Sequence, residues 1–387
     1  MKYARVRQID IPRGRRVLAI SDIHSNRGFL LSVLERAGFS PADLLVLLGD
    51  FVEKRAGGLE TLRTVMDLSR RENVIPVLGN CDDIAVNFAD GDGDGDIDPG
   101  FYDWYFREWG EKCLLVEMGN AVGIRVRGQE DYPALRRAVN THFAPEIAFL
   151  RSLPHIVVSD RYLFVHGGVP REEHLESLEG WRCMKNDNFL SQGHSFRRWC
   201  VVGHWPVTLY DPVVASARPV VEWRRHIISI DGGCSLKLDG QLNALILPGD
   251  GSEEFSYVSW DGFPQVIALD DQAPRTASIN VRYAHNQVEV LREGGEFCRC
   301  RHLESGYELD ILTDYLVRKK DGVYCQDATD YRLPVSRGER LSVVRQTSRG
   351  LLAKKDGVTG WYTGRITPAP PQPATSPGIP LRRDKLG

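Results

Sequence analysis

In this sequence, six side chains of the types that bind divalent metal ions follow directly or within a few residues of short apolar runs. Examples are "LLVLLGD", which ends at Asp50, and "YLFVHGG", which contains His166. In open α/β sheets the ligand-binding residues collect where strands end and loops begin, so all six could lie at one edge of one sheet. Any one of them alone is uninformative, but the joint pattern predicts a shared metal site. The six residues are Asp22, His24, Asp50, Asn80, His166 and His204.

Carboxylate and imidazole ligands suit borderline divalent metals, so we expect Mn, Fe or Zn. Two such ions about 3.5–4 Å apart require a bridging carboxylate, which offsets the repulsion between them. Asp50 is the natural candidate for this bridge. Because a water held between two ions loses its proton near neutral pH and becomes a nucleophile, the ligand set predicts two divalent metal ions and hydrolytic chemistry.

The elements that must position these residues alternate between strands and helices from residue 16 to about residue 250. Apolar runs of about 4–8 residues bounded by turn residues suit buried strands, and "GLETLRTVMDLSRRE" has the periodicity of a helix. This alternation predicts an α/β layered core. From about residue 275 to 366 the chain has short strand-like pieces and glycine turns, which predict one or two small β-barrels.

The composition is that of a soluble globular protein, with 26% charged residues and a formal net charge of −3 in 387 residues. This balance gives no electrostatic reason to expect nucleic-acid binding. The N-terminus lacks the apolar core of a secretion signal, and no apolar run approaches the length of a membrane span. The eight cysteines lack paired CxxC spacing and predict reduced thiols. We therefore expect a cytoplasmic protein with neither a membrane nor a nucleic-acid polymer as partner.

Five ordered motifs resemble those of the calcineurin-like metallophosphoesterases: "SDIHSN", "LLGDFVEKR", "VLGNCDD", "VHGGVP" and "VGHWPV". The block "LPHIVVSDRYLFVHGGVP" and the hairpin "SIDGGCSLKLDGQLNALIL" look like the phosphoprotein-phosphatase branch. That branch includes bacterial serine/threonine phosphatases and symmetrical dinucleotide-tetraphosphate hydrolases. The resemblance covers roughly residues 16 to 248. It implies a β-sandwich flanked by helices, which refines the α/β prediction.

The resemblance also implies a role for each metal ligand. Asp22, His24 and Asp50 would hold the first ion. The second ion would be held by Asp50, Asn80, His166 and His204. A hydroxide bridging the two ions would attack phosphorus in line, and the substrate would be a phosphorylated protein or small molecule.

The sequence departs from the branch in the groups that act beside the metal ions. The branch has "GNHE", whose histidine works with an aspartate to protonate the leaving group, and here Cys81 and Glu53 occupy those positions. A thiol is a weaker hydrogen-bond donor, with an ordinary pKa of about 8.5. The branch also has "DRG", whose arginine binds phosphate. Lys54 matches that arginine by position, and Arg55 could reach the site instead.

We therefore predict a dinuclear metal-dependent phosphoesterase that hydrolyses phosphomonoesters in the manner of a serine/threonine protein phosphatase. Two alternatives stay open. "GNCD" also occurs in small phosphodiesterases of the wider superfamily, which favours a phosphodiesterase or a dinucleoside polyphosphate hydrolase. The missing histidine and the added β modules also leave open a metal-binding scaffold without catalysis. A second phosphate-binding group could come from Arg182, Arg197 or Arg198.

The C-terminal part of the chain predicts small β modules after a metallophosphoesterase domain at residues 1–260. "ATDYRLPVSRGERLSVV" and "GLLAKKDGVTGWYTGRI" resemble a Src-homology-3 barrel. This implies such a barrel at residues 317–367, a smaller and similar module at 275–316, and a proline-rich disordered tail at 368–387. The tryptophan that binds polyproline is absent, with Leu351 in its place. We therefore expect these modules to dock a protein partner or to serve a structural role.

The acidic run "DGDGDGDID", from Asp90 to Asp98, matches the opening of a calcium-binding loop. Phe101 occupies the position of the final bidentate glutamate. Because that ligand is missing, a flexible acidic loop is the favoured interpretation.

Overall fold

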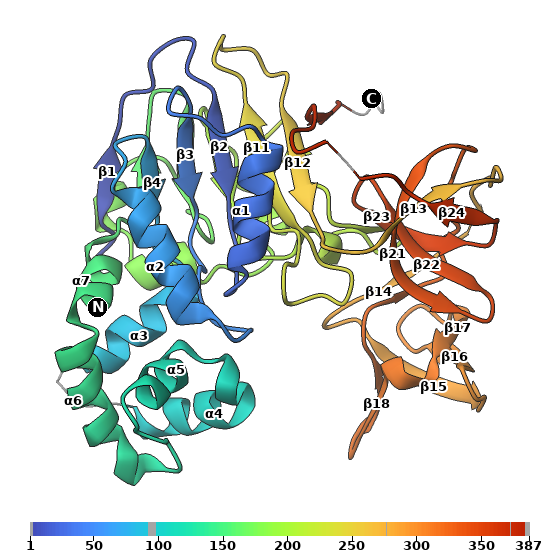
Figure 1. Cartoon of the computed structure of the whole chain (residues 1–387), viewed down its shortest axis with the longest axis horizontal. Helices are drawn as coiled ribbons and strands as arrows, with labels where there is room; N and C mark the ends of the chain where they lie inside the picture. The colour runs from blue at the N-terminus through green and yellow to red at the C-terminus, as the bar shows by residue number, and fades with distance from the viewer. Residues whose placement is uncertain (1–2, 92–97, 276, 372, 384–387) are drawn as a thin grey trace.

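The N-terminal two thirds of the chain form a β-sandwich with most of its helices against one face (Figure 1). This computed structural model describes residues 3–91, 98–275, 277–371 and 373–383. The first sheet has the strand order β25 (Ile379–Pro380), β12 (Ser256–Trp260), β11 (Leu242–Leu247), β2 (Val17–Ile20), β3 (Leu44–Leu47) and β4 (Val74–Pro76). The second has the order β1 (Val6–Gln8), β5 (Ile156–Val158), β6 (Tyr162–Val165), β7 (Trp199–Val202), β10 (Ile227–Ser229) and β9 (Val220–Glu222). The predicted α/β fold with a β-sandwich is confirmed.

Strand β2 shows why its sequence is apolar at every position. Successive side chains of a strand point to opposite faces of the sheet. Val17 and Ala19 pack in the core between the two sheets, whereas Leu18 and Ile20 pack with the helices. Because both faces are covered, the strand is a continuous apolar run without polar alternation.

The helices pack on the outer face of the first sheet through a second large apolar core. They are α1 (Arg27–Arg36), α2 (Gly58–Ser69), α3 (Asn80–Asp90), α4 (Pro99–Trp109), α5 (Leu114–Ala121), α6 (Tyr132–His142) and α7 (Ala144–Ser152), and the short α8 (Gly180–Met184) lies near the second sheet. The Glu117 carboxylate of α5 accepts hydrogen bonds from the N–H groups of Gly57, Gly58 and Leu59. An anion at this end of α2 satisfies N–H groups that have no partner within the helix, so it holds α5 against α2.

Asp82, in the first turn of α3, joins the loops that follow β3 and β4. Its carboxyl oxygens accept hydrogen bonds from the N–H groups of Gly79 (3.1 Å), Asp50 (2.8 Å) and Phe51 (2.8 Å). The two loops approach so closely that a Cβ atom added at Gly79 would lie 2.2 Å from the Asp50 nitrogen. The glycine of "LGN" is therefore required for this packing, which places Asp50 next to the start of α3.

Most of the acidic run from Asp90 to Asp98 lies outside the described residues, which include only its ends, at 90–91 and 98. Asp90 forms an ion pair with Arg151 of α7. Asp98 accepts hydrogen bonds from the N–H groups of Gly100 and Phe101 and so caps α4. Calcium binding by this run stays a prediction.

The C-terminal region forms two further sheets beside the sandwich (Figure 1). One has the order β24 (Ile366–Pro368), β13 (Gln265–Ala268), β21 (Arg340–Thr347), β22 (Gly350–Lys355), β23 (Val358–Tyr362) and β8 (Ala215–Ser216). The other has the order β17 (Glu308–Leu312), β16 (Phe297–His302), β15 (Gln287–Arg292), β19 (Gly322–Cys325) and β18 (Leu316–Lys319). A short pair joins β14 (Asn280–Val281) to β20 (Ala328–Thr329).

These sheets divide the C-terminal region differently from the predicted modules at 275–316 and 317–367. Strand β19 pairs with both β15 and β18, so the boundary expected after residue 316 falls inside one sheet. Strand β8, from the N-terminal part of the chain, pairs with β23. Pairing partners this far apart leave no local signal in the sequence. The resemblance to a Src-homology-3 barrel stays a prediction.

The expectation of a disordered tail at residues 368–387 is wrong for its described second half. Strand β25 extends the first sheet by pairing with β12. Leu381 packs against the core between the sheets, and the Arg383 guanidinium lies 4.9 Å from the centre of the Trp223 ring. Apolar side chains among the prolines allow this segment to add to a sheet edge. Within the described residues, no helix is long and apolar enough to cross a membrane.

Candidate metal centre

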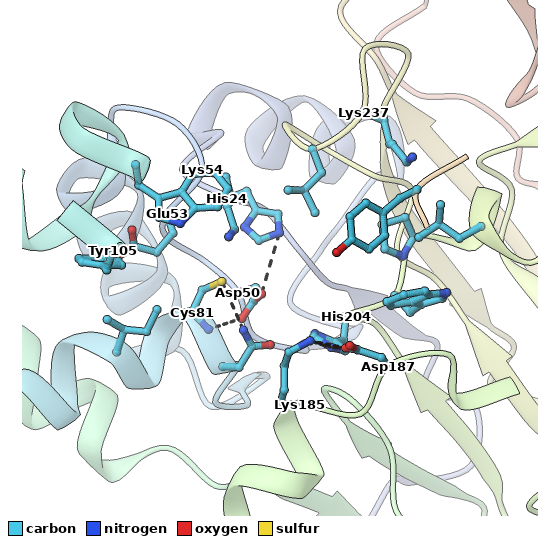
Figure 2. Close-up of a pocket in the computed structure, with 18 of the residues that line it drawn as sticks. His24, Asp50, Glu53, Lys54, Cys81, Tyr105, Lys185, Asp187, His204 and Lys237 are labelled. Carbon is cyan, nitrogen blue, oxygen red and sulfur yellow. Dashed lines mark hydrogen bonds and ion pairs between the residues drawn. The ribbon is translucent and has the colours of Figure 1, made fainter. Parts of the chain in front are cut away.

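The six predicted metal ligands lie where five strands of the sandwich end. Asp22 and His24 follow β2, Asp50 follows β3 and Asn80 begins α3 after β4, all on the first sheet. The other two, His166 and His204, follow β6 and β7 of the second sheet. The two sheets thus bring ligand-type side chains from almost two hundred residues of chain to one edge, as Figure 2 shows for His24, Asp50 and His204.

One group of side chains gathers around Asp22, His24 and Asp50. His24 Nε2 lies 3.8 Å from Asp22 Oδ1 and 3.9 Å from Asp50 Oδ2. His24 Nδ1 lies 3.3 Å from the Val52 carbonyl oxygen. A carbonyl can only accept, so Nδ1 carries the proton and Nε2 presents its lone pair to the two carboxylates.

A second group gathers around the other oxygen of Asp50. His166 Nε2 lies 3.3 Å from Asp50 Oδ1 and 3.2 Å from Asn80 Oδ1. The rings of His166 and His204 lie 5.3 Å apart, centre to centre. His166 Nδ1 lies 2.6 Å from the Leu48 carbonyl oxygen, which again leaves Nε2 free to bind a cation.

Two atoms of the first group test whether a cation fits. Asp22 Oδ1 and His24 Nε2 are buried, and neither has a hydrogen-bond partner within the described residues. Buried polar atoms are rarely left unpaired. Burial raises the pKa of Asp22 to about 6 and lowers that of His24 to about 4, because the charged forms lose their water. A divalent cation between carboxylate oxygen and imidazole nitrogen would remove both deficits, so the donors present fit Mn, Fe or Zn.

Backbone conformations at this edge are unusual. Asp22, His24, Asp50 and His204 all have positive φ, between 46° and 66°. Non-glycine residues adopt this region rarely, and such strain clusters at functional sites. The strand-end pattern therefore located the residues, but nothing in the sequence indicated the sharp turns that aim them.

Cys81 and Glu53, the residues at the positions of the branch's proton donors, both border the same cleft. The Cys81 sulfur lies in a group with side-chain atoms of His24 and Asp50 that are all within 4.8 Å of one another. Burial raises the pKa of its thiol well above the ordinary value. Glu53 Oε1 accepts from the Tyr105 hydroxyl (2.7 Å) and the Leu114 N–H (3.2 Å). Burial raises the pKa of Glu53 to about 8, so its carboxyl group is protonated at neutral pH.

The predicted phosphate-binding groups are divided by the structure. Lys54 borders the cleft, with its Nζ 3.6 Å from the centre of the Trp109 ring. Arg55 is exposed and is not among the residues that line the cleft. The same is true of the three other candidates, which form ion pairs with glutamates instead: Arg182 with Glu179, Arg197 with Glu173 and Arg198 with Glu172.

Sequence reasoning missed three residues near the centre. Lys185 Nζ lies 3.3 Å from His204 Nε2, and Asp187 Oδ1 lies 2.7 Å from the same nitrogen. Both belong to a loop after α8, which carries no strand-end signal. The third is Asp231, a fully buried carboxyl group after β10 whose Oδ2 has no partner within the described residues. Its apolar run "HIISID" has the same form as the other strand ends and could have revealed it.

A cleft of about 690 Å³ opens over this centre. Its floor is lined by four of the predicted ligands and by two residues of the loop after α8: His24, Asp50, Asn80, His204, Lys185 and Asp187. In Figure 2, Glu53 and Tyr105 lie on one side, Lys237 lies on the other, and His24 and Asp50 lie between them. A volume of about 300–1,000 Å³ is usual for small-molecule sites. The arrangement can therefore hold a small anionic group beside two clusters of metal-binding side chains.

Comparisons with known proteins give one family match. A sequence model of the calcineurin-like phosphoesterase family matches residues 15–225, and no curated protein matches the sequence. A solved structure of a candidate diadenosine tetraphosphatase has 18% identity and a TM-score of 0.44, covering 67% of this chain and 100% of its own. A cold-active protein-tyrosine phosphatase of a psychrophilic Shewanella species has 15% identity and a TM-score of 0.40, covering 67% and 83%. A serine/threonine phosphatase from Saccharomyces cerevisiae has 10% identity and a TM-score of 0.41, covering 67% and 84%.

Proposed function

Because this chain belongs to the calcineurin-like phosphoesterase family and is therefore a metal-dependent phosphoric ester hydrolase, we propose that it hydrolyses phosphomonoesters at a centre of two divalent metal ions. The observation that carries this proposal is the position of Asp50. Its Oδ2 lies 3.9 Å from His24 Nε2, while its Oδ1 lies 3.3 Å from His166 Nε2. One carboxylate thus faces two groups of ligands, as a bridge between two ions must.

In this proposal Asp22, His24 and Asp50 would hold the first ion. The second ion would be held by Asp50, Asn80, His166 and His204. When bound, two such ions supply Lewis-acid chemistry at phosphate oxygens and lower the pKa of water. The backbone carbonyls of Val52 and Leu48 orient the two imidazoles for this role through their Nδ1 atoms.

The remaining side chains of the cleft would bind the phosphate and hold a proton for the leaving group. Lys54 and Lys185 would contact phosphate oxygens as point charges. The Cys81 thiol and the Glu53 carboxyl group both keep their protons at neutral pH. Either one would serve as the donor that the branch's histidine provides.

Phosphoprotein is the substrate class that the resemblance to serine/threonine phosphatases favours. A second candidate, hydrolysis of phosphodiesters or dinucleoside polyphosphates, is supported by the extent of the cleft, which continues past the metal ligands to Tyr283 and Gln326. Rates on chromogenic monoester and diester substrates with added Mn²⁺ separate the two. A clear preference for the diester would reject the phosphomonoesterase proposal. Bound metal without turnover of any ester would instead support the scaffold alternative.

The mechanism itself is tested by replacing Asp50 with asparagine. One well-placed electrostatic group is commonly worth about 10²–10³ in rate, and Asp50 would serve two ions, so we expect kcat to fall by at least about 10³-fold. Metal content, measured on the same protein, should also fall. Asp250→Asn, at an exposed turn after β11, is the matched control and should keep full activity. Full metal-dependent turnover by Asp50→Asn would refute the mechanism.

A further inference from the structure

Large apolar side chains that are exposed to solvent gather in the cleft above the metal centre. Within the described residues thirteen such side chains are exposed, and six of them line this one cleft. An exposed apolar patch of this kind marks a binding surface more often than chance. The six are Phe101, Trp104, Trp181, Leu236, Leu238 and Tyr283.

Tyr283 comes from the C-terminal β region and is presented on a fixed turn. Its side chain is 66% exposed. The turn is closed by the His285 N–H, which donates to the Arg282 carbonyl oxygen at 2.9 Å. Arg282 Nε donates to the Leu209 carbonyl oxygen at 3.0 Å, which ties the turn to the segment after His204. The tyrosine ring is therefore held at the cleft although it buries little surface of its own.

Leu236 and Leu238 lie on a second turn that connects this ring to the metal centre. At one end Ser235 Oγ donates to the His24 carbonyl oxygen at 3.2 Å. At the other end Lys237, between the two leucines, forms an ion pair with Asp327 of the C-terminal β region. We call Leu236, Leu238 and Tyr283 the outer wall of the cleft. Its position is fixed relative to His24 on one side and to the β region on the other.

The outer wall presents an aromatic ring and aliphatic side chains, with amide groups nearby. Asn286 and Gln326, both from the β region, line the same cleft. Aromatic rings stack well on flat π-systems, and such stacking tolerates many ring types. Amide groups can pair with the polar edge of a heteroaromatic ring. The anionic end of the same ligand would face Lys54 and Lys185 on the floor.

We propose that the outer wall is a subsite for a planar aromatic ring carried by the leaving group of a small phosphoester, so that the C-terminal β region forms part of the substrate site. This inference rests on the proposed function, because the ring is positioned relative to a phosphate bound at the metal centre. The ring could come from a nucleoside or from a phenol. The amide groups of Asn286 and Gln326 favour the nucleoside.

Two substrate pairs test the proposal on the full chain with Mn²⁺. Adenosine 5′-monophosphate and ribose 5-phosphate share the same leaving oxygen and differ by the base. Phosphotyrosine and phosphoserine test the phenol. We expect Tyr283→Ala to lower kcat/KM by about tenfold or more for one of the two ring-bearing substrates, adenosine 5′-monophosphate or phosphotyrosine. Stacking on one aromatic side chain has about that effect. Ribose 5-phosphate and phosphoserine should change less than about twofold.

Two variants serve as controls for this experiment. Tyr283→Phe keeps the ring and should restore most of the lost kcat/KM. Tyr3→Ala removes a tyrosine that is also 66% exposed but lies outside the described lining of the cleft, and it should change nothing. Equal losses on both members of a pair, or no loss on either ring-bearing substrate, would overturn the proposal. So would a phosphoserine peptide that is strongly preferred and insensitive to Tyr283→Ala.

Binding of adenosine, measured by calorimetry, separates a failure of this inference from a failure of the proposed function. Adenosine has no phosphate, so its affinity does not depend on hydrolysis. If the wild type hydrolyses none of these esters while Tyr283→Ala still weakens adenosine binding by about tenfold, the subsite stands and the phosphomonoesterase proposal falls. If the wild type hydrolyses them and Tyr283→Ala leaves both adenosine binding and every rate unchanged, the subsite is rejected alone.

Discussion

The metal centre and the outer wall of the same cleft are built in opposite ways. Asp50 and His166, at the ends of core strands, are 2% and 0% exposed. Tyr283, on a turn of the C-terminal β region, is 66% exposed. The groups we propose to perform the chemistry are thus part of the folded core, whereas the side chains of the outer wall, which we propose to select the leaving group, are 39% to 66% exposed. Substitutions at the centre should therefore damage stability and turnover together, and substitutions near the wall should change substrate choice alone.

Among substitutions outside the proposed ligands, the largest effect is expected from Asp82→Asn, which would remove hydrogen bonds that support the metal centre. The carboxyl oxygens of Asp82 accept from the N–H groups of Gly79, Asp50 and Phe51. An amide nitrogen in place of one oxygen would face N–H donors with its own hydrogens. Leaving buried groups unpaired costs about 1–3 kcal/mol each, so we expect a loss of about 2–4 kcal/mol of stability. Supporting groups around a metal site commonly affect activity by about 10–100-fold.

Thermal unfolding and kcat/KM on the same preparations check this prediction. Asp67→Asn, on the exposed face of α2 in a pair with Arg70, is the matched control and should alter neither quantity. An Asp82→Asn protein with unchanged Tm but lost activity would show that the centre and the core can be damaged separately, contrary to the comparison.

An intermediate effect is expected from Glu53→Gln. It appears only when the stability of the variant is compared with wild type at several pH values. Burial raises the pKa of Glu53 from 4.5 to about 8. Between pH 4.5 and pH 8 the folded state therefore keeps a proton on Glu53 that the unfolded state has released. The contribution of Glu53 to stability is full below about pH 4.5 and is lost as the pH rises to about 8. Glutamine is neutral at every pH. The Tm of the variant relative to wild type should therefore rise from pH 5 to pH 8, by on the order of 5 °C.

Scanning calorimetry at several pH values measures that difference. Glu60→Gln, on the exposed surface of α2, provides the baseline and should show no such trend. A Tm difference between Glu53→Gln and wild type that stays constant across this range would mean that Glu53 is not held protonated in the folded protein.

The smallest effect is expected from Asn280→Ala, which tests how the outer wall, rather than the metal centre, is supported. Asn280 is buried, and its Nδ2 donates to the carbonyl oxygens of Thr208 and Asp211 at 2.8 Å each. Asn280→Ala should loosen the β region where it meets the sandwich. We expect KM for adenosine monophosphate to rise about two- to fivefold, with kcat and the KM for ribose 5-phosphate nearly unchanged. Asn120→Ala, on an exposed position of α5, is the control, and a fall in kcat on both substrates would contradict this view.

The same contrast explains how much the sequence could predict. Buried strands require continuous apolar runs, so the positions of Asp50, His166 and the other strand-end residues were readable, and Asp231 was readable by the same signal. Lys185 comes from a loop, where no periodicity constrains the side chain. Lys54 and Arg55 are neighbours, and only the backbone, with φ of +73° at Glu53 and +69° at Lys54, decides which of them borders the cleft.

Pairing between distant strands was equally hidden. The apolar content of residues 316–325 predicts strands, but their partner β15 depends on how the whole C-terminal region closes. The C-terminal tail is the opposite case, in which the sequence predicts no regular structure and the chain forms a strand. Its prolines predict disorder, yet a two-residue strand with one isoleucine is enough to extend the first sheet when β12 offers an open edge.

The pairing of β8 with β23 also has a consequence for biosynthesis. Ala215 and Ser216 leave the ribosome long before their partners in β23, so during translation the nascent sandwich carries a short segment of backbone whose hydrogen bonds are not yet made. Unpaired strand edges invite association with other chains. A shortened protein that ends after the sandwich would keep that exposed segment permanently, and such a fragment should be more prone to aggregation than the full chain.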